Sequence, residues 1–126
     1  MDILRTSKLL KTYKQGAKLI YAVNYVDFIV QKGQFIAITG ASGSGKSTFL
    51  NLCAGIDKPS RGSVFIDDID ISKINSDELA DIRRNKIGIV FQQFNLLSMM
   101  TVRENIIIPT LLNNSKPDKQ YFDEIV

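Results

Sequence analysis

The sequence predicts an α/β fold in which strand-rich segments come first and a glycine-rich turn leads into the first helix. Residues 3–13 and 19–30 are rich in β-branched and aromatic residues, and the Gln15-Gly16-Ala17 turn between them is typical of two antiparallel strands. The continuous apolar run 34–39 indicates a strand buried on both faces of a parallel sheet. That run ends in a glycine cluster, which marks the change from strand to helix.

Length and composition limit the class of protein. A chain of 126 residues with 44% apolar residues has room for one packed core, which argues against disorder. Because there is no histidine, catalytic triads and imidazole zinc sites are excluded within this chain. Cys53 is the only cysteine and has no partner for an internal disulfide, so an intracellular setting is the default expectation.

The charge and hydropathy patterns give little sign of a nucleic-acid or membrane protein. The net charge of +3 is spread along the chain without a basic run, so no nucleic-acid partner is predicted. No stretch approaches the roughly 18 apolar residues that cross a bilayer, and the N-terminus lacks the order of a signal peptide. We therefore expect no transmembrane segment in this chain. Any contact with a membrane is expected to be made through a partner protein.

The segment after the glycine cluster predicts a helix over residues 46–54. Gly55 is expected at its C-terminal end. The spacing predicts one apolar face formed by Phe49, Leu50, Cys53 and Ala54. Cys53 is therefore interpreted as a core residue.

The remaining elements are shorter. They are a strand over 63–67, a helix that Ser76 or Asp77 caps and that reaches Arg84, a buried strand over 86–91, a helix that Thr101 caps and that Pro109 ends or kinks, and a helical pattern over 116–126. Asp67 and Asp68, which follow an apolar run, are interpreted as turn residues. The basic residues near Arg84 are interpreted as the charged face of a surface helix.

Residues 40–47, Gly-Ala-Ser-Gly-Ser-Gly-Lys-Ser, match the phosphate-binding pattern G-x-x-x-x-G-K-[ST] at every fixed position, between a strand and a helix. Glycines let successive amides point inward, and the helix adds the positive end of its dipole. We expect Lys46 to contact the β- and γ-phosphates of ATP, Ser47 to bind Mg²⁺ and Thr48 to reach the α-phosphate. The alternative is a flexible Gly/Ser turn with an incidental lysine. The expected phosphate-loop residues are Gly40, Ser42, Gly43, Ser44, Gly45, Lys46, Ser47 and Thr48.

Further strings, combined with this loop, resemble the ATP-binding subunits of ABC transporters. They are Tyr13, the string Val90-Phe91-Gln92-Gln93-Phe94-Asn95-Leu96-Leu97, and Thr101-Val102-Arg103-Glu104-Asn105. Within that family the chain most resembles the branch that serves lipoprotein release, macrolide export and antimicrobial-peptide resistance. The resemblance implies a P-loop NTPase (RecA-like) core with an N-terminal antiparallel β-subdomain.

The resemblance also implies roles for two residues outside the loop. Tyr13 matches the aromatic residue that stacks on adenine, and the alternative is an ordinary half-buried strand aromatic. Gln92 matches the glutamine that reaches Mg²⁺ and the attacking water, so it joins Lys46 as an expected catalytic residue and Ser47 as an expected metal ligand. The alternative for Gln92 is a solvated glutamine at a strand end.

Several parts of the family pattern do not occur in the chain. These are the L-S-G-G-Q signature, the Walker B aspartate, the catalytic glutamate and the switch histidine. We therefore expect the N-terminal half of a cassette, with residues 1–96 forming the β-subdomain and core and residues 97–126 starting a helical subdomain. Such a half would leave a strand edge unpaired.

The expected function is the ATP-binding component of an ABC transporter that couples ATP binding and hydrolysis to a membrane permease. ATP and Mg²⁺ are the expected cofactors. The expected partners are a membrane permease and a second ATP-binding subunit. Through the permease, the chain is expected at the inner face of the cell membrane. The alternative is a fragment that binds ATP without hydrolysing it. A nucleotide or shikimate-type kinase shares the loop pattern but does not explain Tyr13 or the string around Gln92.

Overall fold

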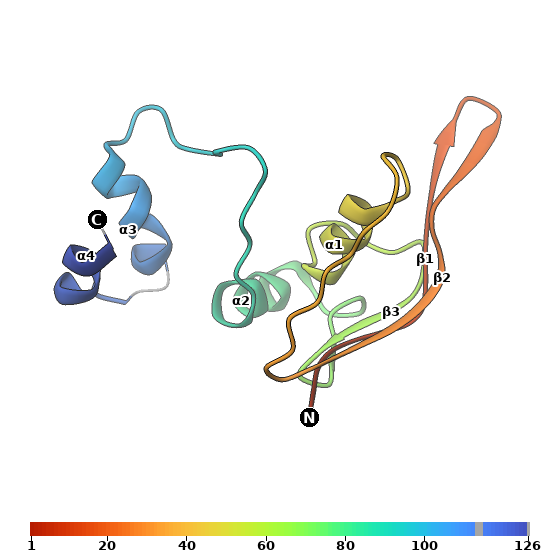
Figure 1. Ribbon diagram of the computed structural model, residues 1–126, viewed down its shortest axis with the longest axis horizontal. Helices are drawn as coiled ribbons and strands as arrows, with labels where there is room; N and C mark the ends of the chain where they lie inside the picture. Colours follow the sequence, from red (N-terminus) through yellow and green to blue (C-terminus); the bar gives the residue numbers. More distant parts are fainter. Residues whose placement is uncertain (113–114, 126) are drawn as a thin grey trace. The chain divides into compact units, whose positions relative to one another are not determined.

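Two long strands, β1 (Asp2–Gln15) and β2 (Lys18–Gln31), form an antiparallel hairpin in the computed structural model, which describes residues 1–112 and 115–125. The chain divides into two units, Met1–Ile87 and Gly88–Val126 (Figure 1). In the first unit, β1 also pairs with β3 (Arg61–Ile66), which pairs with β4 (Ile69–Asp70). The sheet order is β2-β1-β3-β4, and every pairing is antiparallel, which confirms the predicted N-terminal strands.

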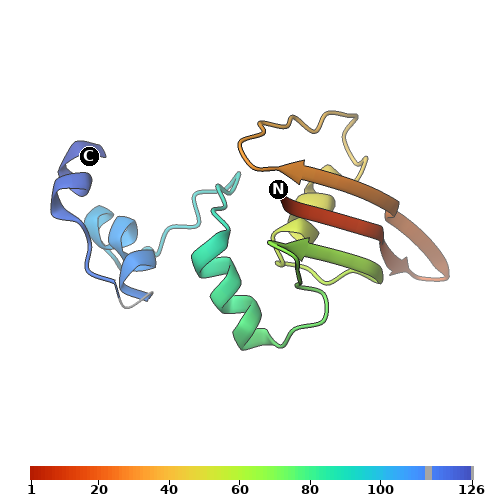
Figure 2. The ribbon, with the colours of Figure 1, turned by 90° about the horizontal axis from the view of Figure 1, so that it is seen from below.

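Helix α1 (Lys46–Cys53) lies across one face of this sheet (Figure 2). Its C-terminal end is a Schellman motif, in which the Ile56 N–H donates to the Asn51 carbonyl at 2.9 Å and the Gly55 N–H to the Leu52 carbonyl at 3.1 Å. Gly55 has φ +64°, the left-handed conformation that this motif requires. The prediction of Gly55 at the helix end is therefore confirmed.

The apolar face of α1 differs from the predicted one. Leu50 is 53% exposed, whereas Leu52 is 1% exposed. The buried residues are Phe49, Leu52 and Cys53, which follow the i, i+3, i+4 spacing of a helix that packs on one side. Burial raises the pKa of the Cys53 thiol to about 12, so Cys53 is an unreactive core residue, as predicted.

The core of the first unit joins the sheet to α1 and α2 (Ser76–Lys86). The Phe49 ring meets Phe28 of β2 edge-on, with the centroids 5.4 Å apart. Thr6 is a buried polar residue beside this core, and its hydroxyl donates to the Val26 carbonyl at 3.0 Å. The buried core residues are Leu9, Val23, Phe49, Leu52, Cys53, Val64, Ile66, Ile71 and Leu79.

The N-cap of helix α2 lies one residue before the first of the predicted cap residues. Asn75, rather than Ser76 or Asp77, is the N-cap, and its side chain accepts from the Glu78 N–H at 2.9 Å. The Glu78 carboxylate in turn accepts from the Asn75 N–H at 3.3 Å, which completes a capping box. The predicted turn at Asp67 is confirmed, because it and its neighbour connect β3 to β4 with positive φ angles.

Two predicted strands are not formed. Residues 34–39 and 87–91 have no strand pairing, and their side chains are largely exposed, with Phe35 at 96% and Val90 at 99%. A strand needs a neighbour to complete its ladder of hydrogen bonds. Within the described part of the chain, no segment pairs with either run, so the apolar composition alone does not produce a strand.

The second unit contains α3 (Val102–Leu112) and α4 (Lys119–Ile125). The Thr101 hydroxyl accepts from the Glu104 N–H at 3.3 Å, and Glu104 accepts from the Thr101 N–H at 2.7 Å, which confirms the predicted cap. Pro109 lies inside α3 and does not end it. The predicted terminal helix begins at Lys119, and its last predicted residue, 126, lies outside the described residues.

Within residues 1–112 and 115–125, no helix has the length and apolar character needed to cross a bilayer.

Replacing Leu52 by Ala is expected to lower the free energy of unfolding by about 2–5 kcal/mol, because it leaves a cavity among core side chains. Urea unfolding followed by circular dichroism measures the change. Leu50→Ala, on the exposed side of the same helix, is the matched control and should change the free energy by less than about 1 kcal/mol. Equal losses in the two variants would contradict the assigned face.

Gly45→Ala is expected to destabilise the first unit more than Gly43→Ala. Both glycines have positive φ, +90° and +78°, so alanine at either site pays a backbone cost of about 1–2 kcal/mol. A Cβ at Gly45 would also lie 1.9 Å from the Ala22 carbonyl oxygen, whereas a Cβ at Gly43 meets nothing within 4 Å. Urea unfolding of the pair isolates the Ala22 contact, and identical midpoints would show that β2 can move away freely.

Candidate functional site

The loop of residues 40–47 turns tightly in front of α1. Gly40, Gly43 and Gly45 have φ angles of +154°, +78° and +90°, which residues with a Cβ avoid. Gly45 is also the N-cap of α1 and has no side chain to bond the first amides of the helix. No acidic residue lies in the first turn of α1. The amide end of the helix is therefore a region of uncompensated partial positive charge.

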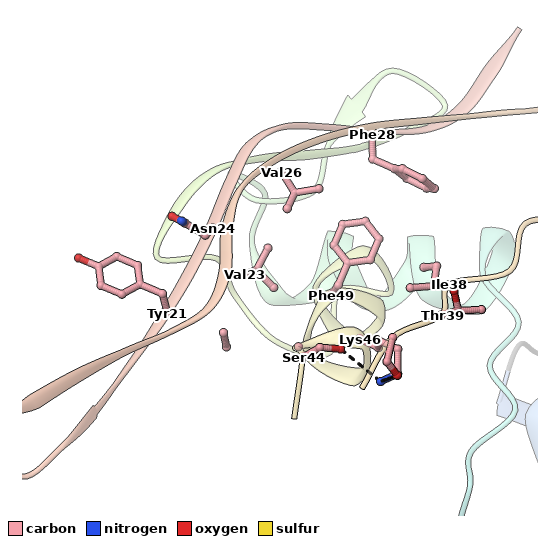
Figure 3. Close-up of a pocket in the computed structure, with 13 residues that line it drawn as sticks. Tyr21, Val23, Asn24, Val26, Phe28, Ile38, Thr39, Ser44, Lys46 and Phe49 are labelled. Atoms are coloured by element: carbon pink, nitrogen blue, oxygen red, sulfur yellow. Dashed lines mark hydrogen bonds between the residues drawn. The ribbon is translucent and has the colours of Figure 1, made fainter. Parts of the chain in front are cut away.

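The Lys46 ammonium turns back over this loop. Its Nζ donates to the carbonyl oxygens of Gly40 at 2.9 Å and Ala41 at 2.7 Å. It also donates to the Ser44 Oγ at 3.3 Å (Figure 3). These contacts hold a full positive charge beside the partial charge of the helix end. The combination is suited to a polyanion, since both terms attract negative charge to the same place.

The loop faces the second strand across a small pocket. Its wall on the β2 side is Ile20, Tyr21 and Ala22, its other wall is residues 43–48, and its volume is about 220 Å³. A larger apolar cavity of about 550 Å³ adjoins it, and Phe49 points into that cavity toward Val26 and Phe28 (Figure 3). The site thus has a polar rim made by the loop and an apolar wall made by the sheet.

The serines of the loop are accessible to solvent. Ser42, Ser44 and Ser47 are exposed, and Thr48 is half-buried. A hydroxyl oxygen such as that of Ser47 is a hard donor suited to Mg²⁺, which binds few protein ligands and keeps the rest of its shell for water and phosphate. In the described residues, no three His, Cys, Asp or Glu side chains gather into a metal cluster. One hydroxyl donor fits a cation that takes its remaining ligands from water and a bound phosphate.

Tyr13 lies on β1 opposite Ile20, beside the small pocket. It is 43% exposed, and its hydroxyl donates to the Asp57 Oδ2 at 2.9 Å. Desolvation, together with the hydrogen bond and charge of Asp57, raises the pKa of Tyr13, while the positive charge of Lys11 and the Thr48 side chain oppose the rise. The structure thus brings Tyr13 and the end of the phosphate loop together.

Gln92 belongs to the second unit. Its side chain is exposed, and it lines a pocket with Phe91, Gln93 and Asn95. The segment around it bends instead of forming the predicted strand.

Sequence reasoning missed two charged residues at this site. Lys11 and Asp57 form an ion pair of 2.6 Å, and Lys11 lies over the Tyr13 ring, with Nζ 5.1 Å from the centroid. Desolvation raises the pKa of Asp57, but the hydrogen bonds from Lys11, Tyr13 and the Lys58 N–H outweigh it, so the net pKa is below its usual value. The available signal was the i, i+2 spacing of Lys11 and Tyr13 on one strand.

Comparison with known proteins identifies relatives for nearly the whole chain. The family model described as ABC transporter matches residues 23–126. The chain is 46% identical to the uncharacterized ABC transporter ATP-binding protein MJ0796 of Methanocaldococcus jannaschii, covering 86% of this chain and 46% of that protein. It is 39% identical to the bacitracin export ATP-binding protein BceA of Halalkalibacterium halodurans, covering 98% and 48%.

A solved structure agrees with these sequence matches. The ATP-binding cassette MJ0796, in a dimeric post-hydrolysis state bound to ADP and Pi, superposes with a TM-score of 0.86 at 42% identity. The alignment covers 94% of this chain and 51% of that one. The chain thus spans about half the length of the relatives it matches, and its α/β fold is that of the N-terminal part of a P-loop NTPase cassette. On these grounds, the chain belongs to the ABC transporter family, among its ATP-binding proteins.

Proposed function

We propose that this chain binds ATP at the loop of residues 40–48, as the ATP-binding component of an ABC transporter. The observation that carries the proposal is the Lys46 ammonium held in front of the glycine loop by the Gly40 and Ala41 carbonyls. Phosphate oxygens are charged and accept stronger hydrogen bonds than these neutral carbonyls do. We therefore expect the Lys46 ammonium to leave the carbonyls and to bind the phosphate when a polyphosphate enters the loop. The relative MJ0796, bound to ADP and Pi, supports an adenine nucleotide as ligand.

Within this proposal, the phosphate contacts come from the loop. The amides of Ser42 to Gly45 and the start of α1 hold the phosphates, Lys46 neutralises their charge, and Thr48 contributes a hydroxyl at the α-phosphate end. Ser47 would hold Mg²⁺, which lowers the negative charge of the phosphates when bound. Gln92 is proposed to reach the metal and to orient the water that attacks, because a neutral amide both donates and accepts.

The proposed partners are a membrane permease and a second ATP-binding subunit. Support for the second subunit is the dimeric state of the relative MJ0796, and support for the permease is that relatives of similar sequence are named as export ATP-binding proteins. We place the chain at the cytoplasmic face of the membrane. In this assignment residues 1–96 serve the nucleotide and residues 97–126 begin the part that meets the permease.

A second candidate function is ATP binding without hydrolysis. Phosphoryl transfer depends on groups placed around the γ-phosphate, so a chain without them loses rate far more than affinity. The two functions differ in phosphate release at saturating Mg-ATP.

Lys46→Ala is expected to weaken ATP binding by about 10- to 100-fold, because a hydrogen-bonded charge pair is worth about 1.5–3 kcal/mol. Titration calorimetry with Mg-ATP measures the affinity. Lys32→Ala removes an exposed lysine outside the loop and is the matched control, with affinity unchanged.

The same samples test the binding and the turnover separately. Saturating ATP, at about 100 times Kd, should stabilise the wild-type chain by about 2.7 kcal/mol in a thermal melt. Equal ATP affinity in wild type and Lys46→Ala would exclude the proposed loop. Tight binding with no phosphate release favours the second candidate function.

A further inference from the structure

We propose that Asp57 is a positioning residue, which fixes the Tyr13 ring at the mouth of the phosphate loop so that one face of the ring is ready to receive the base of the nucleotide. The inference rests on the proposed function and extends it to a residue outside the loop motif. It arises from the cluster that Lys11 and Tyr13 of β1 form with Asp57.

Both oxygens of the Asp57 carboxylate are engaged. Oδ2 accepts from the Tyr13 hydroxyl at 2.9 Å, and Oδ1 accepts from the Lys11 Nζ at 2.6 Å and from the Lys58 N–H at 2.7 Å. Lys11 also donates to the Lys58 carbonyl at 2.7 Å. Because several donors hold the Asp57 carboxylate, it has one orientation, and the oxygen that accepts from the Tyr13 hydroxyl stays in one position.

Tyr13 is thereby held at both ends. Its Cα belongs to β1, where it pairs with Ile20 of β2, and its hydroxyl is tied to Asp57, 44 residues further along the chain. An aromatic side chain at 43% exposure would otherwise rotate about two side-chain torsions. Fixing the ring before the ligand arrives reduces the entropy lost on binding, which increases affinity without any new contact to the ligand.

The cluster also decides which face of the ring is available. Lys11 Nζ lies over one face, 5.1 Å from the ring centroid, where the cation is attracted to the π-electrons. Tyr13 is also 43% exposed, so we propose that the opposite face of the ring receives the stacked base. Tyr13 pairs with Ile20, and Ile20 lines the same small pocket as Thr48, so the ring lies near that end of the loop. A purine attached to a phosphate chain in that loop therefore meets a ring whose position is already set.

A purely structural role for Asp57 makes a different prediction. Asp57 also connects the loop after α1 to β1, so its loss would loosen the first unit as a whole. Loosening would weaken every ligand of the loop, whether or not it carries a base. A positioning role changes only the contribution of the base. Comparing ATP with inorganic tripolyphosphate, which has the charge but no base, separates the two.

The experiment is titration calorimetry of the full chain with Mg-ATP and with magnesium tripolyphosphate. The variants are Tyr13→Phe, which keeps the ring and removes the hydroxyl, Asp57→Ala, and the double variant. Each single change is expected to weaken ATP by about 3- to 10-fold, the range of an aromatic contact, and to leave tripolyphosphate within about twofold. The double variant should lose no more than either single one, because both remove the same bond.

Two further variants keep the test sharp. Asp57→Asn retains an acceptor for the Tyr13 hydroxyl and should lose less ATP affinity than Asp57→Ala. If Asp57→Ala does not fold, Asp57→Asn and Tyr13→Phe still test the proposal. Asp123→Ala removes an exposed aspartate of the second unit and should match wild type with both ligands. Equal losses for ATP and tripolyphosphate, additive losses in the double variant, or no loss in Tyr13→Phe would each overturn the positioning role.

The failure of the proposed function looks different from the failure of this inference. If the wild-type chain binds neither ligand, the phosphate site is wrong, and the inference falls with it. If the wild-type chain binds tripolyphosphate as tightly as ATP, the phosphate site stands, and the base contributes nothing for Tyr13 and Asp57 to support.

Discussion

The close approach of Gly45 to the Ala22 carbonyl oxygen is the contact on which the site depends. Only a residue without a Cβ fits there, because an added Cβ would come within 1.9 Å of that oxygen. The approach brings the first amides of α1 against β2, so the glycine loop lies along Ile20 to Ala22. Two glycine-specific conditions, a positive φ and a close contact, thus act at one position.

The packing behind this contact explains why the loop has a defined place. Phe49, one turn into α1, meets Phe28 of β2 edge-on, and Leu52 is almost fully buried against the sheet. The helix is short, so these few contacts and the Schellman end provide most of its stability. Changes in the core therefore reach the loop through the position of the helix.

The sequence patterns correctly predicted those elements whose hydrogen bonds and contacts join residues close together in the chain. The hairpin, the α1 helix and the Thr101 cap each depend on residues close in sequence, and all three are formed. Residues 34–39 and 86–91 have the composition of buried strands, but a strand also needs a neighbour, which composition does not supply. Similarly, the P-loop is a contiguous motif, whereas the link from Tyr13 to Asp57 joins residues 44 positions apart. No local pattern signals such a pair.

The unpaired apolar runs affect the tendency of the chain to associate with copies of itself. Residues 34–39 and 87–97 contain neither a charge nor a proline, and Phe35, Val90 and Phe94 are each more than nine-tenths exposed. Stretches of this kind, with strong β-propensity and free backbone groups, can stack with copies of themselves into cross-β assemblies. Copies of the chain in which these runs stay uncovered are therefore expected to associate, and any segment or partner that covers the runs is expected to reduce this association.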